Sequence, residues 1–159
     1  MKHSIKVGFN FGTTSAIITT LGLMVGLYSS VGSRLAIIGG IITIAVADAF
    51  SDALGIHISE EDEGKHTQKE IWESTFSTFF FKFIFASVFL IPFLIFNIKI
   101  AVIVSIIFGF FLLGIFSYRL SKKQKKSNPW NIIIEHLFIA CLVIIITYIV
   151  GVIVNKIFI

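Results

Sequence analysis

Residues 99–118 read KIAVIVSIIFGFFLLGIFSY, a run of twenty residues whose only charge is Lys99 at its start. A helix needs about 20 predominantly apolar residues to cross a bilayer, so this run predicts a membrane-spanning helix. Four further runs of the same character lie at 8–29, 35–58, 75–96 and 131–154. We therefore expect an all-α integral membrane protein with five transmembrane helices. They would form a single transmembrane domain over residues 1–159, with a short acidic cytoplasmic insert at 59–74.

The composition of the chain excludes a soluble globular domain. Hydrophobic residues make up 56% of it, charged residues 14%, and the mean hydropathy is +0.96, which leaves too few charges to cover a soluble surface. The net charge of +4 does not indicate a nucleic-acid partner, because the basic residues border the apolar runs. The single cysteine, Cys141, cannot form a disulfide within one chain. The first apolar run is too long for the core of a signal peptide and is expected to remain as the first helix.

The Lys and Arg residues predict the orientation of the spans. Five spans divide the 13 basic residues into ten on one side and three on the other, and the richer side is cytoplasmic by the positive-inside rule. The ten are Lys2, Lys6, Lys65, Lys69, Lys82, Arg119, Lys122, Lys123, Lys125 and Lys126, and the three are Arg34, Lys99 and Lys156. We expect the N-terminus in the cytoplasm, the C-terminus outside, and the basic segment 119–126 against anionic lipids. A prokaryotic plasma membrane is the default location.

Two aspartates, Asp48 and Asp52, lie within the second apolar run. Because they are four residues apart on a helix, both carboxyls point the same way, with Asp48 near the middle of the bilayer. A carboxylate at that depth costs about 2.5–3.5 kcal/mol, so such residues face other helices or water and often mark an ion or proton path. The alternative is a structural role, in which both are protonated or hydrogen-bonded to neighbouring hydroxyls.

The first apolar run carries polar groups that could face this aspartate pair. Its hydroxyl and amide side chains are Asn10, Thr13, Thr14, Ser15, Thr19 and Thr20. Their oxygens could satisfy the aspartates or act as weak ligands for a partly dehydrated cation. We assign the transport path to Asp48, Asp52, Asn10, Thr13, Thr14 and Ser51. For each neutral residue, hydrogen bonding between helices is the open alternative.

Residues 58–73, ISEEDEGKHTQKEIWE, contain two pairs of glutamates at a spacing of three. That spacing places each pair on one face of a helix. Carboxylates with a nearby imidazole suit Mn²⁺ or Fe²⁺, and His57 and His66 can supply the imidazole. We expect metal ligands at Asp52, His57, Glu60, Glu63, Glu70 and Glu73. The alternative is an acidic loop whose charges simply keep it in water.

Residues 7–16, VGFNFGTTSA, resemble the hydroxyl-rich opening of the first helix in the vacuolar iron transporter family. Residues 49–59 are similar to the second-helix motif of that family, and 76–93 and 147–151 resemble its third helix and the end of its fifth. The chain would be a short, divergent member, and the likeness covers most of its length. It implies a homodimer that exports Fe²⁺ or Mn²⁺ from the cytoplasm in exchange for protons, with cytoplasmic carboxylates that gather the metal.

The chain departs from the family pattern at positions that carry the family's chemistry. The first-helix aspartate of the family corresponds to Phe11, the second-helix methionine to Asp52, and the motif glutamate and tyrosine to Ile56 and His57. The acidic insert is also much shorter than the family's metal-binding domain. The carboxylate near the path would then lie on the second helix instead of the first.

An enzymatic function is not expected. Intramembrane Asp-x-x-x-Asp also occurs in metal-dependent phosphatidyl transferases, but the sequence lacks their second acidic cluster and the Gly-x-Gly-Asp motif of intramembrane aspartyl proteases. No permanently bound cofactor is expected, and Fe²⁺ or Mn²⁺ is the transported ion. The expected partners are a second copy of the chain, anionic lipids and divalent cations, without nucleic acid. A non-transporting membrane subunit or regulator on the same scaffold is the alternative to a divalent-metal transporter.

Overall fold

The computed structural model describes residues 2–122 and 128–158. Lys123, Lys125 and Lys126 of the basic segment lie outside these residues. All regular structure in the described ranges is helical, which confirms the all-α prediction. The elements are α1 (His3–Ser30), α2 (Arg34–Thr43), the π-helical segment η1 (Ile44–Asp48), α3 (Ala49–Glu63), α4 (Gln68–Val88), α5 (Leu90–Ile95), α6 (Ile98–Ser121) and α7 (Pro129–Phe158).

Five helical rods in the described chain are long and apolar enough to cross a membrane, as the sequence predicts. Three are the single helices α1, α6 and α7, and two combine elements: α2 through α3 (Arg34–Glu63) and α4 with α5 (Gln68–Ile95). The Arg34–Glu63 rod has 30 residues. It spans about 45 Å at 1.5 Å per residue, which exceeds a hydrocarbon core of about 30 Å. The acidic insert is therefore built from the end of α3 and the start of α4, which project beyond the apolar layer.

Local sequence explains where the rods end. Gly64 adopts a left-handed conformation with φ of +62° and closes α3, a role that favours glycine. Thr67 and Glu70 form a reciprocal capping box at the start of α4. The side chain of Asn97 accepts a backbone hydrogen bond at the start of α6, so the hairpin between the third and fourth spans needs few residues.

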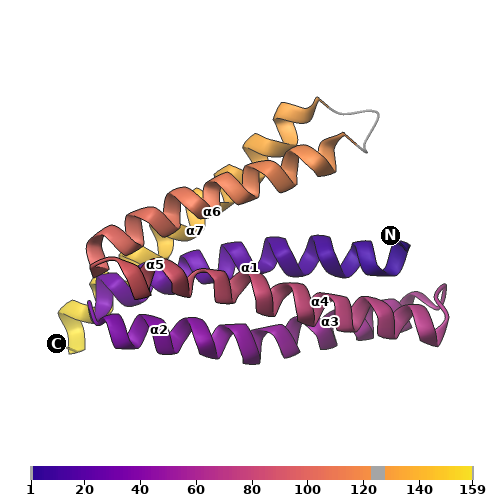
Figure 1. Cartoon of the computed structure of the whole chain (residues 1–159), viewed down its shortest axis with the longest axis horizontal. Coiled ribbons are helices and arrows are strands. Elements are labelled where there is room, and N and C mark those ends of the chain that lie inside the picture. Colours follow the sequence, from indigo (N-terminus) through magenta and orange to yellow (C-terminus); the bar gives the residue numbers. More distant parts are fainter. Residues whose placement is uncertain (1, 123–127, 159) are drawn as a thin grey trace.

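Helix α1 lies in the middle of the bundle. It packs most extensively against α4 and α7. Figure 1 shows the α2–α3 rod and α4 on one side of α1 and the α6–α7 hairpin on the other, leaning away toward the end that carries the N-terminus. Glycines permit the close crossings: a Cβ added to Gly12 would lie 2.6 Å from the Thr78 carbonyl oxygen, and one added to Gly151 would lie 2.5 Å from the Gly26 carbonyl oxygen.

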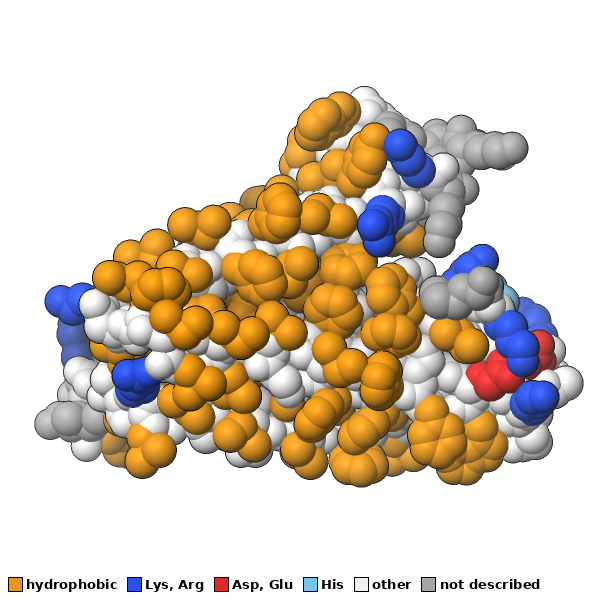
Figure 2. Space-filling view, in the orientation of Figure 1, with side chains coloured by type: hydrophobic (Ala, Val, Ile, Leu, Met, Phe, Trp, Pro, Cys, Tyr) orange, Lys and Arg blue, Asp and Glu red, His pale blue; other side chains and the backbone are white. Residues whose placement is uncertain are grey.

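The surface of the chain has the polarity of a membrane protein. In Figure 2 hydrophobic side chains cover the middle of the molecule, and the visible charged side chains gather toward its ends. One end, here called the charged end, includes Lys2, Glu63, Lys65, Lys69 and Glu73. Large apolar side chains are exposed along the four outer rods, as expected for faces that contact lipid, whereas the central α1 exposes Phe11.

One basic residue does not follow this pattern. The sequence assigns Lys82 to the cytoplasmic side with nine other basic residues. Its side chain extends from α4 and is fully buried in the helix bundle. The reason is that Lys82 pairs with acidic residues of a neighbouring helix and does not need water. That assignment is therefore wrong, and the residue belongs to the interior.

Candidate functional site

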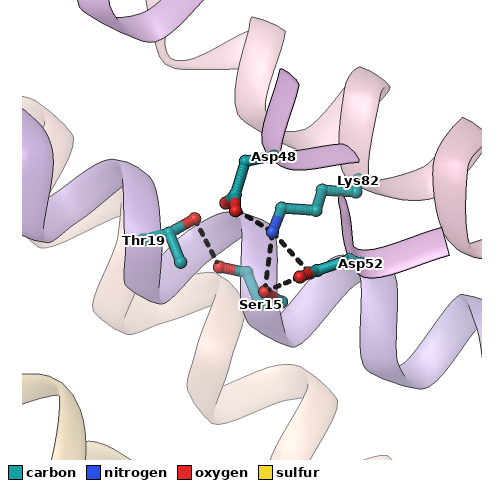
Figure 3. Close-up of polar contacts among 5 residues, drawn as sticks. All are labelled: Ser15, Thr19, Asp48, Asp52 and Lys82. Carbon is teal, nitrogen blue, oxygen red and sulfur yellow. Dashed lines mark hydrogen bonds and ion pairs between the residues drawn. The ribbon is translucent and has the colours of Figure 1, made fainter. Parts of the chain in front are cut away.

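Four polar side chains from three helical rods meet inside the bundle, as Figure 3 shows. They are Ser15 of α1, Asp48 at the end of η1, Asp52 in the first turn of α3 and Lys82 of α4, and we call them the Asp–Lys cluster. Asp48 is the fifteenth of the 30 residues in its rod, and Lys82 is the fifteenth of 28. The cluster therefore lies near the middle of the membrane-spanning helices.

The ammonium of Lys82 is the centre of the cluster. Its Nζ lies 2.5 Å from Asp48 Oδ2, forms an ion pair with Asp52 Oδ2, and donates to Ser15 Oγ at 3.0 Å. Ser15 Oγ in turn donates to Asp52 Oδ2 at 2.6 Å. Both aspartates thus face one group, as their spacing of four residues predicts. Asp48 Oδ2 makes only the ion-pair contact, with no hydrogen bond to another described residue.

The charges of the cluster do not cancel. Two carboxylates and one ammonium leave a formal charge of −1 when all three are ionised. Lys82 is fully buried, whereas the Asp52 and Asp48 side chains are 18% and 32% exposed. Uncompensated charge is costly in a low-dielectric interior. Asp48 is the more exposed of the two carboxylates that share this ammonium.

An open groove of about 440 Å³ gives access to Asp48 from outside the chain. It is lined by Thr19, Thr43, Ile44, Ala47, Asp48 and Ser51. Three hydroxyls and one carboxylate therefore border a groove that leads to the Asp–Lys cluster. The π-helical segment forms part of its wall. Such turns are rare in proteins overall, but those that occur are often at functional sites.

The structure places the other residues of the predicted path in different surroundings. Ser51 is exposed and lines the groove beside Asp48. Thr13 is fully buried, and its hydroxyl has no hydrogen-bond partner in the described chain. Asn10 and Thr14 are half-buried on α1, and neither is among the side chains that bond to the Asp–Lys cluster. Of the hydroxyls in α1, Ser15 is the one that reaches the aspartates.

The predicted metal ligands of α3 separate onto two faces. Glu60 is buried and accepts a hydrogen bond from the Ser74 hydroxyl of α4. His57 lies on the same side, where its Nδ1 is 2.9 Å from Thr75 Oγ1. Glu63 is exposed, and its Oε2 is 3.7 Å from His66 Nε2. The pair Glu60 and Glu63 therefore does not share one ligand sphere.

The two glutamates of α4 already have partners within the chain. Glu70 accepts from the Thr67 backbone N–H at 2.9 Å and from its hydroxyl at 2.8 Å. Glu73 accepts from Lys2 Nζ at 2.6 Å and from Ser4 Oγ at 2.8 Å. Both carboxylates lie in the polar first turns of α4 at the charged end, outside the apolar part of the span.

These contacts stabilise the charged form of both carboxylates. The backbone and hydroxyl of Thr67 hold the pKa of Glu70 below its usual value, and hydrogen bonds from Lys2 and Ser4 lower the pKa of Glu73. In the part of the chain that the structure describes, no three His, Cys, Asp or Glu side chains lie close enough together to hold a metal ion. The assignment of metal ligands stays a prediction.

Sequence analysis missed the role of Lys82. A signal for it exists, because Lys82 interrupts the run FSTFFFKFIFASVF, and a lysine within an apolar span is costly unless it has a partner. Asp48 and Asp52 are the acidic residues deep within an apolar run, whereas Glu135 lies near the start of its run. This pairing could have been inferred from charge alone, whereas the choice of Ser15 among the polar residues of α1 could not.

Comparison with known proteins gives one match. The family model described as the VIT family matches residues 61–152, from the end of α3 to near the end of α7. The matched range includes Lys82 and excludes Ser15, Asp48 and Asp52. No curated protein and no solved structure matches the chain.

Proposed function

The chain belongs to the VIT family, a family of metal-ion transporters, and on that basis we propose that it carries Fe²⁺ or Mn²⁺ out of the cytoplasm in exchange for protons. Its five apolar helical rods make it an integral membrane protein. The observation that carries the proposal is the Asp–Lys cluster. It holds two carboxylates in the middle of the spans, beside a groove lined with hydroxyls.

The chemistry of the cluster suits a hard divalent cation. Its oxygen donors are carboxylates and hydroxyls, the ligands that Mn²⁺ and similar cations accept. By the resemblance drawn from the sequence, Asp52 corresponds to a methionine in the family, so a hard carboxylate would stand in place of a soft thioether. This favours Mn²⁺ as the first ion to test. Carboxylates that release a metal can accept protons in turn, which supports proton exchange.

A third carboxylate, the buried Glu60, lies between the charged end and the cluster. Glu60 lies eight residues beyond Asp52 on α3, so the two are about 12 Å apart along the helix axis. Spacings of four place Asp48, Asp52, Ile56 and Glu60 near one face of the rod. Antiparallel α4 offers Ser74 opposite Glu60 and Lys82 opposite Asp52. With the charged end in the cytoplasm, a route to the cluster runs from Glu60 inward.

A homodimer would complete the site. The Arg34–Glu63 rod exposes small residues at every fourth position, a pattern that permits close helix packing in membranes. These residues are Gly39, Thr43, Ala47, Ser51, Gly55 and Ser59, and all six are exposed. A Cβ added to Gly39 or Gly55 would meet nothing within 4 Å, so nothing in the described chain uses the small size of either glycine. A partner helix packed here would cover the groove beside Asp48 and add ligands to it.

Anionic lipids are the proposed environment of the cytoplasmic face. A groove of about 600 Å³ between α6 and α7 is lined by Tyr118, Arg119, Lys122 and Trp130 together with apolar side chains. Basic and aromatic residues at a membrane boundary bind lipid headgroups. We place the protein in a prokaryotic plasma membrane with this face inward.

A non-transporting subunit is the second candidate function. The observation that favours it is the pairing of both aspartates with Lys82, which gives the intramembrane carboxylates a structural partner. On this alternative, the cluster holds α1, α3 and α4 together and binds no metal.

Flux into liposomes separates the two functions. Purified protein would be reconstituted around a divalent-sensitive dye, and Mn²⁺ and Fe²⁺ uptake followed with and without a pH gradient. We expect saturable uptake that the gradient accelerates and that the Asp48→Asn/Asp52→Asn variant loses. Absence of flux for both ions would contradict the transporter and support the subunit.

A further inference from the structure

The position that a bound cation would take in the Asp–Lys cluster is already occupied. Lys82 Nζ contacts Asp48 Oδ2, Asp52 Oδ2 and Ser15 Oγ, so three oxygens from two other helical rods surround one positive charge. The ammonium is attached to α4, and its side chain is fully buried. A divalent cation that binds both carboxylates would therefore meet a like charge at contact distance.

We propose that Lys82 is a tethered competitor for the transported cation. This inference rests on the proposed function and assigns a regulatory role within the same site. In the state described here, the ammonium holds the two carboxylates, and an arriving divalent cation binds only as the ammonium leaves them. When the cation departs, Lys82 returns, so the aspartates are never left without a positive partner inside the membrane.

The surroundings of Lys82 are consistent with exchange of one cation for another. Asp48 Oδ2 is held by charge alone, without a hydrogen bond to another described residue, and Asp48 is the carboxylate that borders the open groove. Whichever way a cation reaches the cluster, Asp48 is the carboxylate that Lys82 can leave without breaking a hydrogen bond. Asp52 is held more firmly, because both Lys82 and Ser15 donate to it. Displacement would thus begin at Asp48 and end at Asp52.

A permanent structural ion pair predicts a different change in cation affinity when the lysine is removed. If Lys82 only stabilises the fold, its loss leaves cation affinity unchanged or destroys the site. If Lys82 competes, its loss frees two carboxylates for the metal. The sign of the change in affinity therefore separates the two roles.

The test measures Mn²⁺ binding to purified full-length protein in detergent, with free Mn²⁺ followed by electron paramagnetic resonance. Lys82→Met removes the charge and keeps an unbranched apolar side chain. We expect its Kd for Mn²⁺ to fall by about tenfold or more, since a unit charge at contact distance is worth at least that much inside a protein. Lys82→Arg, the matched control, keeps the charge and should bind Mn²⁺ no more tightly than the wild type. An unchanged or higher Kd in Lys82→Met would overturn the proposal.

A second measurement uses the wild type and does not depend on how well a variant folds. An amine-reactive acylating reagent would be applied with and without Mn²⁺, and modification at Lys82 quantified by mass spectrometry. Displacement predicts more modification when Mn²⁺ is present, and an unchanged level would count against it. Lys99 at the opposite end serves as the internal control for reagent activity.

The two proposals fail in different ways. If neither the wild type nor Lys82→Met binds Mn²⁺ at millimolar concentration, the transporter proposal fails together with this one. If the wild type binds Mn²⁺ and Lys82→Met binds it equally well, only the role of Lys82 as a competitor is lost.

Discussion

At the scale of single residues, Asp52 and Glu61 form a matched pair of carboxylates on the same helix. Asp52 accepts from Lys82 and Ser15 in the middle of the bundle, whereas Glu61 is largely exposed and lies 3.6 Å from His57 Nε2. Asp52→Asn should lower the initial Mn²⁺ flux into liposomes by about tenfold or more, because it removes a charge from within the apolar layer.

Glu61→Gln is the control for this prediction. It removes the same charge at the charged end, where water screens it, and should leave flux within about twofold of the wild type. Similar losses in the two variants would show that Asp52 does not lie on the path.

The residues of the cluster differ in how far the sequence could predict them. The shared direction of Asp48 and Asp52 follows from their spacing, and the structure has both in contact with Lys82. Ser15 was one of several polar residues in its helix, and only the packing of α1 against α4 selects it. Lys82 was misplaced because sorting charges by span takes no account of a partner thirty residues earlier in the chain.

At the scale of elements, the crossing of α1 and α4 depends on Gly12. An added Cβ would lie 2.6 Å from the Thr78 carbonyl oxygen, so Gly12→Ala must push the helices apart. Overpacking of this kind costs about 1–3 kcal/mol, and here it also separates Ser15 of α1 from Lys82 of α4. We expect a clear fall in melting temperature in detergent together with weaker Mn²⁺ flux.

Gly114 of α6 provides the matched control for the crossing. It is helical, but a Cβ added there would meet nothing within 4 Å. Gly114→Ala should therefore keep or slightly raise the melting temperature, because alanine favours a helix by up to about 1 kcal/mol. Equal melting temperatures for the two variants would contradict the close approach at Gly12.

The capping box of α4 gives another prediction at this scale. Thr67→Ala removes the hydroxyl that accepts from the Glu70 backbone, and loss of such a cap costs about 1 kcal/mol. The melting temperature in detergent should fall, while Thr67→Ser, which keeps the hydroxyl, should stay near the wild type. A serine variant as unstable as the alanine variant would show that the cap is not the cause.

The five apolar rods were predictable because hydropathy and length are properties of the local sequence. The interruptions within them were not all predictable. The break between α4 and α5 follows from Pro92, which has no N–H for the carbonyl of Val88, the last residue of α4. The π-helical segment at 44–48 contains neither proline nor glycine, and nothing local in its sequence indicates it.

At the scale of the whole molecule, the exposed small residues of the Arg34–Glu63 rod predict the dimer interface. Gly55→Leu places a large side chain where a partner helix would pack closely, and it should shift the protein from dimer to monomer in detergent. Gly114→Leu makes the same change at another open glycine on α6 and should leave the dimer intact. Light scattering coupled to size-exclusion chromatography measures both. A dimer that survives Gly55→Leu would place the interface elsewhere.

The order of helices along the chain also bears on how the protein enters its membrane. The Arg34–Glu63 rod, which carries both aspartates, is synthesised before α4, and Lys82 follows Asp52 by thirty residues. Until α4 leaves the ribosome, two carboxylates, each costing about 2.5–3.5 kcal/mol at the bilayer centre, have no ammonium to pair with. Membrane integration of the second span should therefore become more favourable when the third arrives with its opposite charge. The ion pair thus favours joint insertion of these two spans, in which a helical hairpin partitions into lipid as a unit.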